Sequence, residues 1–156
     1  MKKIACYLDT TIFNFVFAEG DAERKDITAK FFNNLPSIAE GIYISEEVIR
    51  EISRAPEPRK SQLEDLVRKT NPLLLDIDLE TEELAERYIK EGIIPEKYRS
   101  DALHIAVTVI NGIDVIVSWN FEHIVKLKTR IMVGGVNKLL GYHEIEICSP
   151  EEVVEP

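Results

Sequence analysis

The chain has 156 residues, of which 45% are hydrophobic and 30% are charged. This number of hydrophobic side chains is enough for one buried core but not for two, so we predict a single domain over residues 1–156. This composition excludes the disordered and collagen-like classes of protein. The net charge of −9 argues against binding nucleic acid through a broadly positive surface, so any such contact must be local.

The first half of the chain alternates short apolar runs with helical patterns. The continuous apolar run 4–8 stops at a polar segment and predicts a buried strand, and 42–44 predicts a second strand. Apolar spacing predicts a helix over 24–35, which Pro36 closes. Ser45 is a suitable N-cap for a helix that presents Val48, Ile49 and Ile52 to the core and stops at the prolines of 56–58, and an amphipathic helix follows around 63–67.

The second half repeats this alternation. Residues 73–77 predict a strand, and a helix that ends at Gly92 follows. The segment from Ser100 to Gly112 is apolar on nearly every side and predicts a buried helix, followed by a β-branched strand at 113–118. The remaining predictions are a helix that starts at 121–125, a turn at the two glycines of 134–135, a short helix at 136–140 and an edge strand at 144–148.

Strands separated by helices indicate an α/β protein, a three-layer sandwich with a mostly parallel central sheet. In such sheets, ligands bind beyond the carboxyl ends of the strands. The polar residues at those ends are Asp9, Glu47 and Glu51, Asp101, and the segment 118–120. Clustered carboxylates repel each other unless a cation lies between them, and hard oxygen ligands select Mg²⁺ or Mn²⁺ rather than zinc. The sequence therefore predicts a metal site.

Each of these residues also has a purely structural interpretation. Asp9 could cap a turn, and Asp101 suits the first turn of a helix because the helix dipole favours a carboxylate there. Glu51 lies one turn after Glu47, as on a solvated helix face, and Asn120 suits an N-cap. His104 is predicted to be a buried, hydrogen-bonded histidine rather than a catalytic one. The prediction of a site therefore depends on the joint placement of the acids.

Four short motifs over residues 4 to 125 carry a resemblance to one family. They are Leu8-Asp9-Thr10-Thr11, the stretch from Ile44-Ser45 to Glu51-Ile52, Ser100-Asp101-Ala102-Leu103-His104-Ile105-Ala106, and Val117-Ser118-Trp119-Asn120-Phe121 with Ile124. Together, in this order, they resemble a PIN domain, the fold of the VapC-type toxin ribonucleases and their relatives. The resemblance implies an Mg²⁺- or Mn²⁺-dependent endoribonuclease, possible antitoxin binding, and a homodimer.

The resemblance also implies roles for individual residues. Asp9, Glu51 and Asp101 match the catalytic, metal-binding acids of the family. Asn120 stands near the family's fourth acidic position, where it can offer a carbonyl ligand but brings no charge, and this puts a second metal in doubt. We assign Asp9 and Asp101 as the main ligands and Glu51 as a ligand or an orienter of the attacking water. Thr10 and Ser118 are candidate hydrogen-bond donors that support the site.

Contacts to RNA would require local cations and aromatic rings. Two basic clusters qualify, at 126–130 and at 54–60, although a solvated basic face explains each as well. Trp119 could stack on an unpaired base or pack against the sheet. Two other functions stay open: a catalytically inactive PIN-fold module that binds RNA or protein, and a phosphotransfer enzyme with Asp9 as nucleophile. The phosphotransfer pattern expects a second aspartate where Thr11 stands.

Location and assembly follow from simpler features. Asp9 interrupts the N-terminal apolar stretch, so no secretory signal is predicted, and no apolar run approaches the roughly 18 residues of a membrane helix. Cys6 and Cys148 are too far apart in sequence to suggest a disulfide framework or a zinc site. We expect a cytoplasmic protein without membrane contact. The phenylalanines of 13–17 are hard to bury on one face, which suggests a homodimer surface there.

Overall fold

The structure, a computed structural model, describes residues 3–154 and is built on a parallel β-sheet. Within these residues the sheet has five strands in the order β3-β2-β1-β4-β5, and every neighbouring pair is parallel. The strands are β1 (Ile4–Leu8), β2 (Ala39–Ser45), β3 (Leu73–Leu75), β4 (Val115–Val117) and β5 (Glu146–Cys148). The predicted α/β architecture with a mostly parallel sheet is confirmed.

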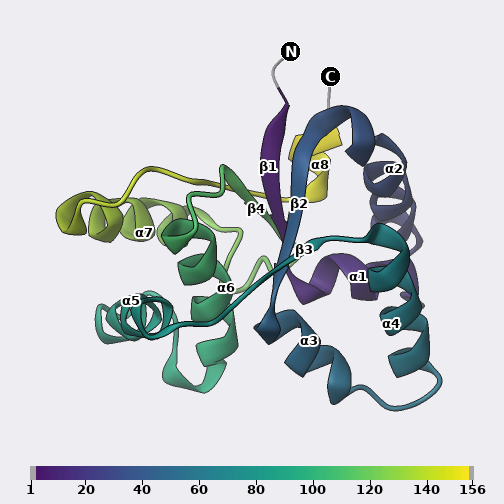
Figure 1. Ribbon diagram of the computed structural model, residues 1–156, viewed down its shortest axis with the longest axis horizontal. Helices are drawn as coiled ribbons and strands as arrows, with labels where there is room; N and C mark the ends of the chain where they lie inside the picture. The colour runs from purple at the N-terminus through teal and green to yellow at the C-terminus, as the bar shows by residue number, and fades with distance from the viewer. Residues whose placement is uncertain (1–2, 155–156) are drawn as a thin grey trace.

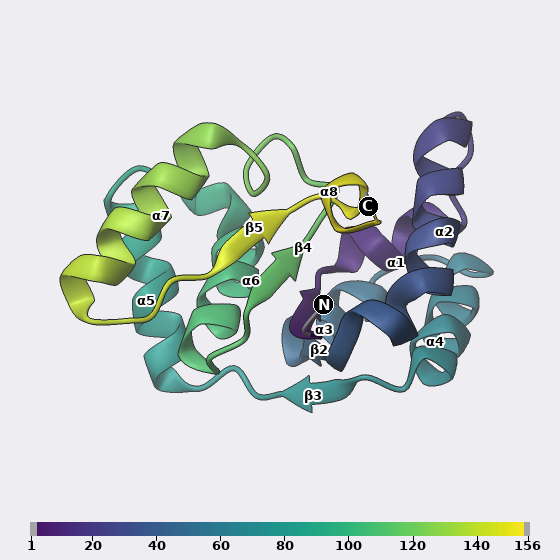
Figure 2. The same cartoon turned by 90° about the horizontal axis from the view of Figure 1, so that it is seen from above.

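Helices cover both faces of the sheet (Figures 1 and 2). They are α1 (Thr10–Val16), α2 (Ala22–Ile38), α3 (Glu46–Ser53), α4 (Arg59–Thr70), α5 (Leu79–Lys90), α6 (Arg99–Ile110), α7 (Leu127–Leu140) and α8 (Pro150–Val154), with a single 3₁₀ turn, η1 (Glu96–Tyr98). Helices α5, α6 and α7 lie on one face, and α1, α2 and α4 lie on the other. No helix among the described residues is long and apolar enough to span a membrane.

The core is centred on β1 and α6. Strand β1 has neighbours on both edges and helices on both faces, and its residues Cys6, Tyr7 and Leu8 have no exposed surface. Every residue of α6 from Ala102 to Val109 is buried as well, because this helix lies between the sheet and α5 (Figure 2). The polar residues at the end of β1 and the start of α6 are therefore held by the best-packed elements of the molecule.

Some predicted boundaries are wrong. Helix α2 continues through Pro36 to Ile38, because a proline in the last turn removes one backbone donor and the Ala39 amide still bonds to the Leu35 carbonyl. Residues 121–126 form turns rather than the start of a helix. Helix α7 then runs without a break through the glycines of 134–135, where a turn was predicted.

The physical reason for α7 is burial. A glycine costs about 1 kcal/mol inside a helix, and here Val133 and Val136 are buried against the core on either side of the glycine pair. Burial of these two side chains outweighs the backbone cost. In α3, Ile49 was predicted to face the core with its neighbours, but it is 45% exposed.

The phenylalanines of α1 do not form an exposed surface. Phe13 is fully buried, and Phe15 and Phe17 are partly buried against the core. The observation that suggested a homodimer surface there is therefore absent, and the homodimer stays a prediction. The exposed apolar side chains lie elsewhere, for example Leu73 on the edge strand β3 and Leu127 on α7.

Candidate active site

The Asp9 carboxylate lies directly after β1 and is the N-cap of α1. It is 2% exposed. Its Oδ1 accepts hydrogen bonds from the Thr11 amide (3.1 Å) and hydroxyl (2.5 Å), and its Oδ2 accepts one from the Ser118 hydroxyl at the end of β4 (2.6 Å). Burial raises the pKa of Asp9 to about 6, although His104 and these donors act in the opposite direction. The structural interpretation of Asp9 as a cap is correct and coexists with its position at the sheet edge.

Glu51 connects the end of β1 with α6. Its Oε1 accepts a hydrogen bond from the Thr10 hydroxyl (2.6 Å) and lies 2.6 Å from Nε2 of His104. Burial acts to raise the pKa of Glu51, but the bonds from His104 and Thr10 hold it below its ordinary value. Glu51 is therefore an ionised carboxylate whose position is fixed from two sides.

His104 is buried and hydrogen-bonded, as predicted, and its partner is an acid of the site. It is 2% exposed, and its Nδ1 lies 2.7 Å from the Tyr7 hydroxyl, which lies 2.8 Å from the Ser45 hydroxyl. Burial acts to lower the pKa of His104, but contact with Glu51 outweighs it and the pKa is raised. A buried polar chain thus runs from β2 through β1 to α6 and ends at Glu51.

Helices α3 and α6 make a second contact, between Glu47 and Ser100, one helical turn before the contact between Glu51 and His104. Glu47 is 4% exposed; it forms an ion pair with Arg50 and accepts a hydrogen bond from the Ser100 hydroxyl (2.6 Å). Glu47 and Glu51 on α3 therefore face Ser100 and His104 on α6, with the same four-residue spacing on both helices. The interpretation of these glutamates as a solvated face does not hold for Glu47.

Asp101 lies at the start of α6 and has a histidine partner that sequence reasoning missed. Its Oδ2 lies 2.8 Å from Nδ1 of His123. Burial raises the pKa of Asp101, although the bond with His123 opposes this. The Asn120 side-chain oxygen accepts a hydrogen bond from the His123 amide (2.9 Å), and the Asn120 side chain acts to lower the pKa of Asp101. Asn120 thus caps the turn that places His123 next to Asp101.

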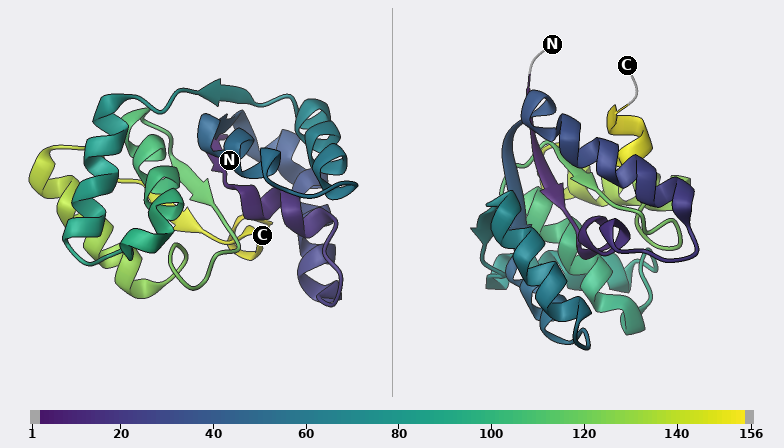
Figure 3. Two further views of the ribbon diagram at one scale, coloured as in Figure 1. Left: turned by 90° about the horizontal axis from the view of Figure 1, so that it is seen from below. Right: turned by 90° about the vertical axis from the view of Figure 1, so that its right-hand side faces the viewer.

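The acids lie in segments that follow the carboxyl ends of the central strands or pack beside them. Figure 3 (left) shows this edge of the sheet from below. Asp9, Glu51 and Asp101 come from three distant segments, and each of them interacts with the charge of His104, which acts to lower its pKa against the effect of burial. Within residues 3–154, however, no group of three His, Cys, Asp or Glu side chains is arranged to hold a metal ion. The predicted residues are brought together, but not as a closed cage of ligands.

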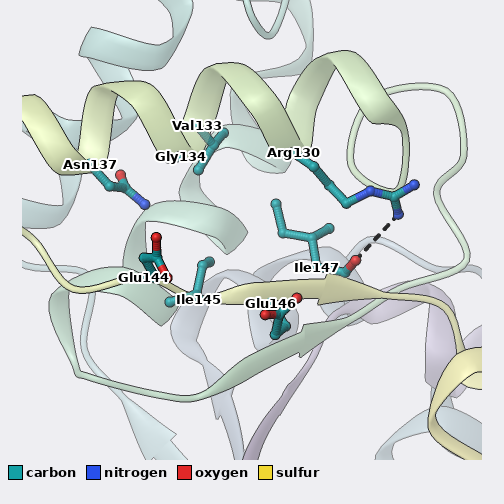
Figure 4. A pocket seen from close by; sticks show the side chains of 8 residues that line it. All are labelled: Arg130, Val133, Gly134, Asn137, Glu144, Ile145, Glu146 and Ile147. Carbon is teal, nitrogen blue, oxygen red and sulfur yellow. Dashed lines mark hydrogen bonds between the residues drawn. The ribbon is translucent and has the colours of Figure 1, made fainter.

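Several cations of the predicted basic clusters are bonded to the protein itself. Arg59 donates to the Phe17 carbonyl (2.9 Å), and Lys128 donates to the Gly92 carbonyl (3.2 Å). Arg130 lies in a cavity of about 230 Å³ between α7 and β5, where it donates to the Ile147 carbonyl (Figure 4). Trp119 is 3% exposed and its indole NH donates to the Thr28 hydroxyl, so it packs into the protein rather than offering a face to a base.

Comparison with solved structures places this fold among known ones. The chain is similar to VapC20 of Mycobacterium tuberculosis, a toxin that cleaves the sarcin-ricin loop, with a TM-score of 0.59 and 16% identity over 76% of this chain and 92% of that chain. It is also similar to VapBC2 of Rickettsia felis, solved bound to a DNA fragment from the promoter, with a TM-score of 0.54 and 18% identity over 74% of this chain and 87% of that chain. No family model and no curated protein matches the sequence. The chain therefore has the PIN-domain fold of the VapC toxins, as its four motifs predicted.

Proposed function

We propose that the protein is an Mg²⁺- or Mn²⁺-dependent endoribonuclease that hydrolyses RNA phosphodiester bonds at Asp9, Glu51 and Asp101. One observation carries the proposal: the Glu51 carboxylate bonds both to Thr10, next to Asp9, and to His104, one turn after Asp101. This contact gathers acids from three segments at the edge where parallel sheets bind ligands. The fold shared with VapC20, described as a toxin that cleaves the sarcin-ricin loop, supports the same reaction class.

The residues present fit a hard divalent cation by their chemistry. All of the candidate ligands offer carboxylate or amide oxygens, which Mg²⁺ and Mn²⁺ prefer. Burial, with a contribution from the charge of Glu51, raises the pKa of Asp9, and a bound cation would oppose both effects. The open arrangement of the acids suits Mg²⁺, which keeps several waters and binds through one or two carboxylates rather than in a protein cage.

Each acid is held by donors of this chain. The hydroxyls of Thr11 and Ser118 orient Asp9, and His123 orients Asp101, as Thr10 and His104 orient Glu51. When bound, a divalent cation lowers the pKa of a coordinated water and offsets the negative charge that develops on the phosphate. The hydrogen bonds from these side chains hold the carboxylate oxygens in one geometry, so that less free energy is lost in rearranging them when a cation binds.

The partners follow from the same fold. VapBC2 was solved on a DNA fragment from its promoter, and this supports a toxin–antitoxin pair in which a small antitoxin binds the present chain near its acids. We also propose that the protein acts in the cytoplasm and as a homodimer.

A second candidate is a catalytically inactive module that binds RNA or a protein. Asn120 favours this alternative, because it is neutral and its side-chain oxygen already accepts a hydrogen bond from the His123 amide. With one negative charge fewer, the site attracts a second cation less strongly.

Calorimetric titration with Mn²⁺ tests the choice between the two. Wild type should bind Mn²⁺ and cleave RNA, whereas Asp9→Asn should lose both. The matched control is Asp65→Asn, which removes the same charge from a side chain that is 74% exposed on α4 and should behave as wild type. Absence of Mn²⁺ binding by wild type would contradict the proposal and favour the inactive module. RNA cleavage that survives in Asp9→Asn would contradict the assigned metal site and point to another site or to a contaminating nuclease.

A further inference from the structure

The exposed aromatic rings of the protein both border the acidic site. Among the described residues, Tyr98 and Phe121 are the phenylalanine, tyrosine or tryptophan residues that are exposed, each at 39%. Tyr98 ends η1, three residues before Asp101, and Phe121 directly follows Asn120. Their aromatic character and their position in the segments that carry the site distinguish these two side chains from the exposed aliphatic ones, most of which lie on β3, α5 and α7.

Each ring is braced from behind by a buried side chain. The Tyr98 ring lies over the imidazole of His123, with ring centroids 4.2 Å apart and planes inclined by 39°. The Phe121 ring meets the buried Trp119 edge-on, with centroids 5.9 Å apart and an angle of 78°. Rings that are held in this way lose little conformational freedom when a flat ligand stacks on their open side.

The two rings connect to different acids. Behind Tyr98, His123 is bonded to Asp101. Behind Phe121, the Trp119 amide donates to the Thr11 hydroxyl, which in turn donates to Asp9. Each ring is therefore linked through buried residues to one acid of the site. The two rings are the exposed aromatic groups available to the bases that flank a phosphate bound at the acids.

A cation accompanies each ring. The Lys97 ammonium lies 5.7 Å from the centre of the Tyr98 ring, and the Arg24 guanidinium lies 4.7 Å from the centre of the Phe121 ring. The chain has a net charge of −9, so these are local positive groups beside the rings. Arg24 also forms an ion pair with Asp21 (3.7 Å). Stacking on a ring with a cation beside it is a common way to bind single strands without reading their sequence.

We infer that Tyr98 and Phe121 each stack on an unpaired base of the substrate, with Lys97 and Arg24 at the flanking phosphates. This inference rests on the proposed ribonuclease function and deepens it, because it assigns the side chains that hold unpaired bases beside the acids. Bases inside an A-form duplex are stacked on each other and cannot reach a protein ring.

Fluorescence anisotropy with a short, labelled, single-stranded phosphorothioate RNA, which resists cleavage, measures binding in the presence of Mg²⁺. Phe121→Ala and Tyr98→Ala should each weaken binding by roughly 10-fold, and Phe121→Tyr should keep it. Phe121→Leu, which preserves an apolar side chain but removes the ring, should weaken binding as much as the alanine variant. The control is Leu79→Ala, which removes a 69% exposed apolar side chain from α5 and should not change affinity.

The outcomes separate this inference from the proposed function. If wild type cleaves RNA while both alanine variants bind single strands with unchanged affinity, the stacking inference is wrong and the ribonuclease proposal stands. If wild type binds single strands through both rings but hydrolyses no RNA, the inference stands and the ribonuclease proposal fails. Equal affinity of wild type for single-stranded and duplex RNA would overturn the inference, and a protein partner would then be the ligand to seek for these rings.

Discussion

The buried carboxyl group of Asp9 makes a test of the site possible without any substrate. Asp9→Asn keeps the shape of the side chain, an oxygen that can accept from Thr11, and an NH₂ group that can donate to the Ser118 oxygen. It removes the negative charge. In protein freed of divalent cations with a chelator, we expect this substitution at the centre of the proposed site to stabilise the fold at neutral pH.

The magnitude follows from the pKa of Asp9, which burial raises from 3.8 to about 6. At 1.36 kcal/mol for each pKa unit, ionising Asp9 costs the folded state roughly 3 kcal/mol relative to the unfolded chain. The folded state binds the proton more tightly, so this stability is fully present below about pH 4 and is lost as the pH rises through about 6. The asparagine does not titrate and avoids that loss. For a chain of this length, the gain corresponds to roughly 6–12 °C in melting temperature at about pH 8.

Thermal melts of wild type and Asp9→Asn between about pH 4 and pH 8 measure the effect, which should grow with pH. Glu47→Gln should show the opposite sign. Burial acts to raise the pKa of Glu47, but the bonds from Arg50 and Ser100 hold it below its ordinary value. Its stabilising effect is therefore present near pH 7 and is lost as the pH falls through the acidic range. If Asp9→Asn folds but melts at or below the wild-type temperature at about pH 8, the reasoning about the buried charge is refuted.

Further predictions concern stability elsewhere. Ser118→Ala removes a hydroxyl donor from the buried carboxylate after β1 and should lower the free energy of unfolding in urea by about 2 kcal/mol, and an unchanged midpoint would contradict this. Tyr88→Phe leaves the buried Oδ1 of Asn137 without its 2.5 Å hydrogen bond; we expect a loss of about 1–3 kcal/mol in the same assay. Gly141→Ala should lose about 1 kcal/mol in thermal melts, since φ is +81° there, whereas Gly134→Ala, within α7, should gain a similar amount.

The parts of the fold that local pattern controls could be predicted. The run 4–8 is continuously apolar because β1 is buried on both faces, and the polar residue that ends it is the first residue beyond the sheet. By the same argument, Ser118 was predicted to be a polar residue at the end of the buried apolar strand that is now β4. Only the end of α7, at 136–140, was predicted, because a pair of glycines is a strong local signal for a turn. The burial of Val133 and Val136, which compensates for the glycines, depends on the tertiary fold.

The partners of the acids could not be predicted, because they come from distant positions. Glu51 and His104 are 53 residues apart, and Asp101 and His123 are 22 apart, so no helical or strand periodicity relates them. One signal was present. The acids at 47 and 51 and the polar residues at 100 and 104 share a four-residue spacing, which would have placed two facing rows on neighbouring helices.

The bond between Ser118 and Asp9 has a consequence for synthesis, because the two residues are 109 positions apart. During translation, Asp9 emerges early and remains without this donor until β4 has been made and has inserted beside β1 in the sheet. Contacts of such long range form late, after the entropy of closing a large loop has been overcome. A nascent or truncated chain that stops before β4 therefore lacks the hydrogen bond that orients Asp9. The proposed ribonuclease activity would then begin only after β4 has joined the sheet.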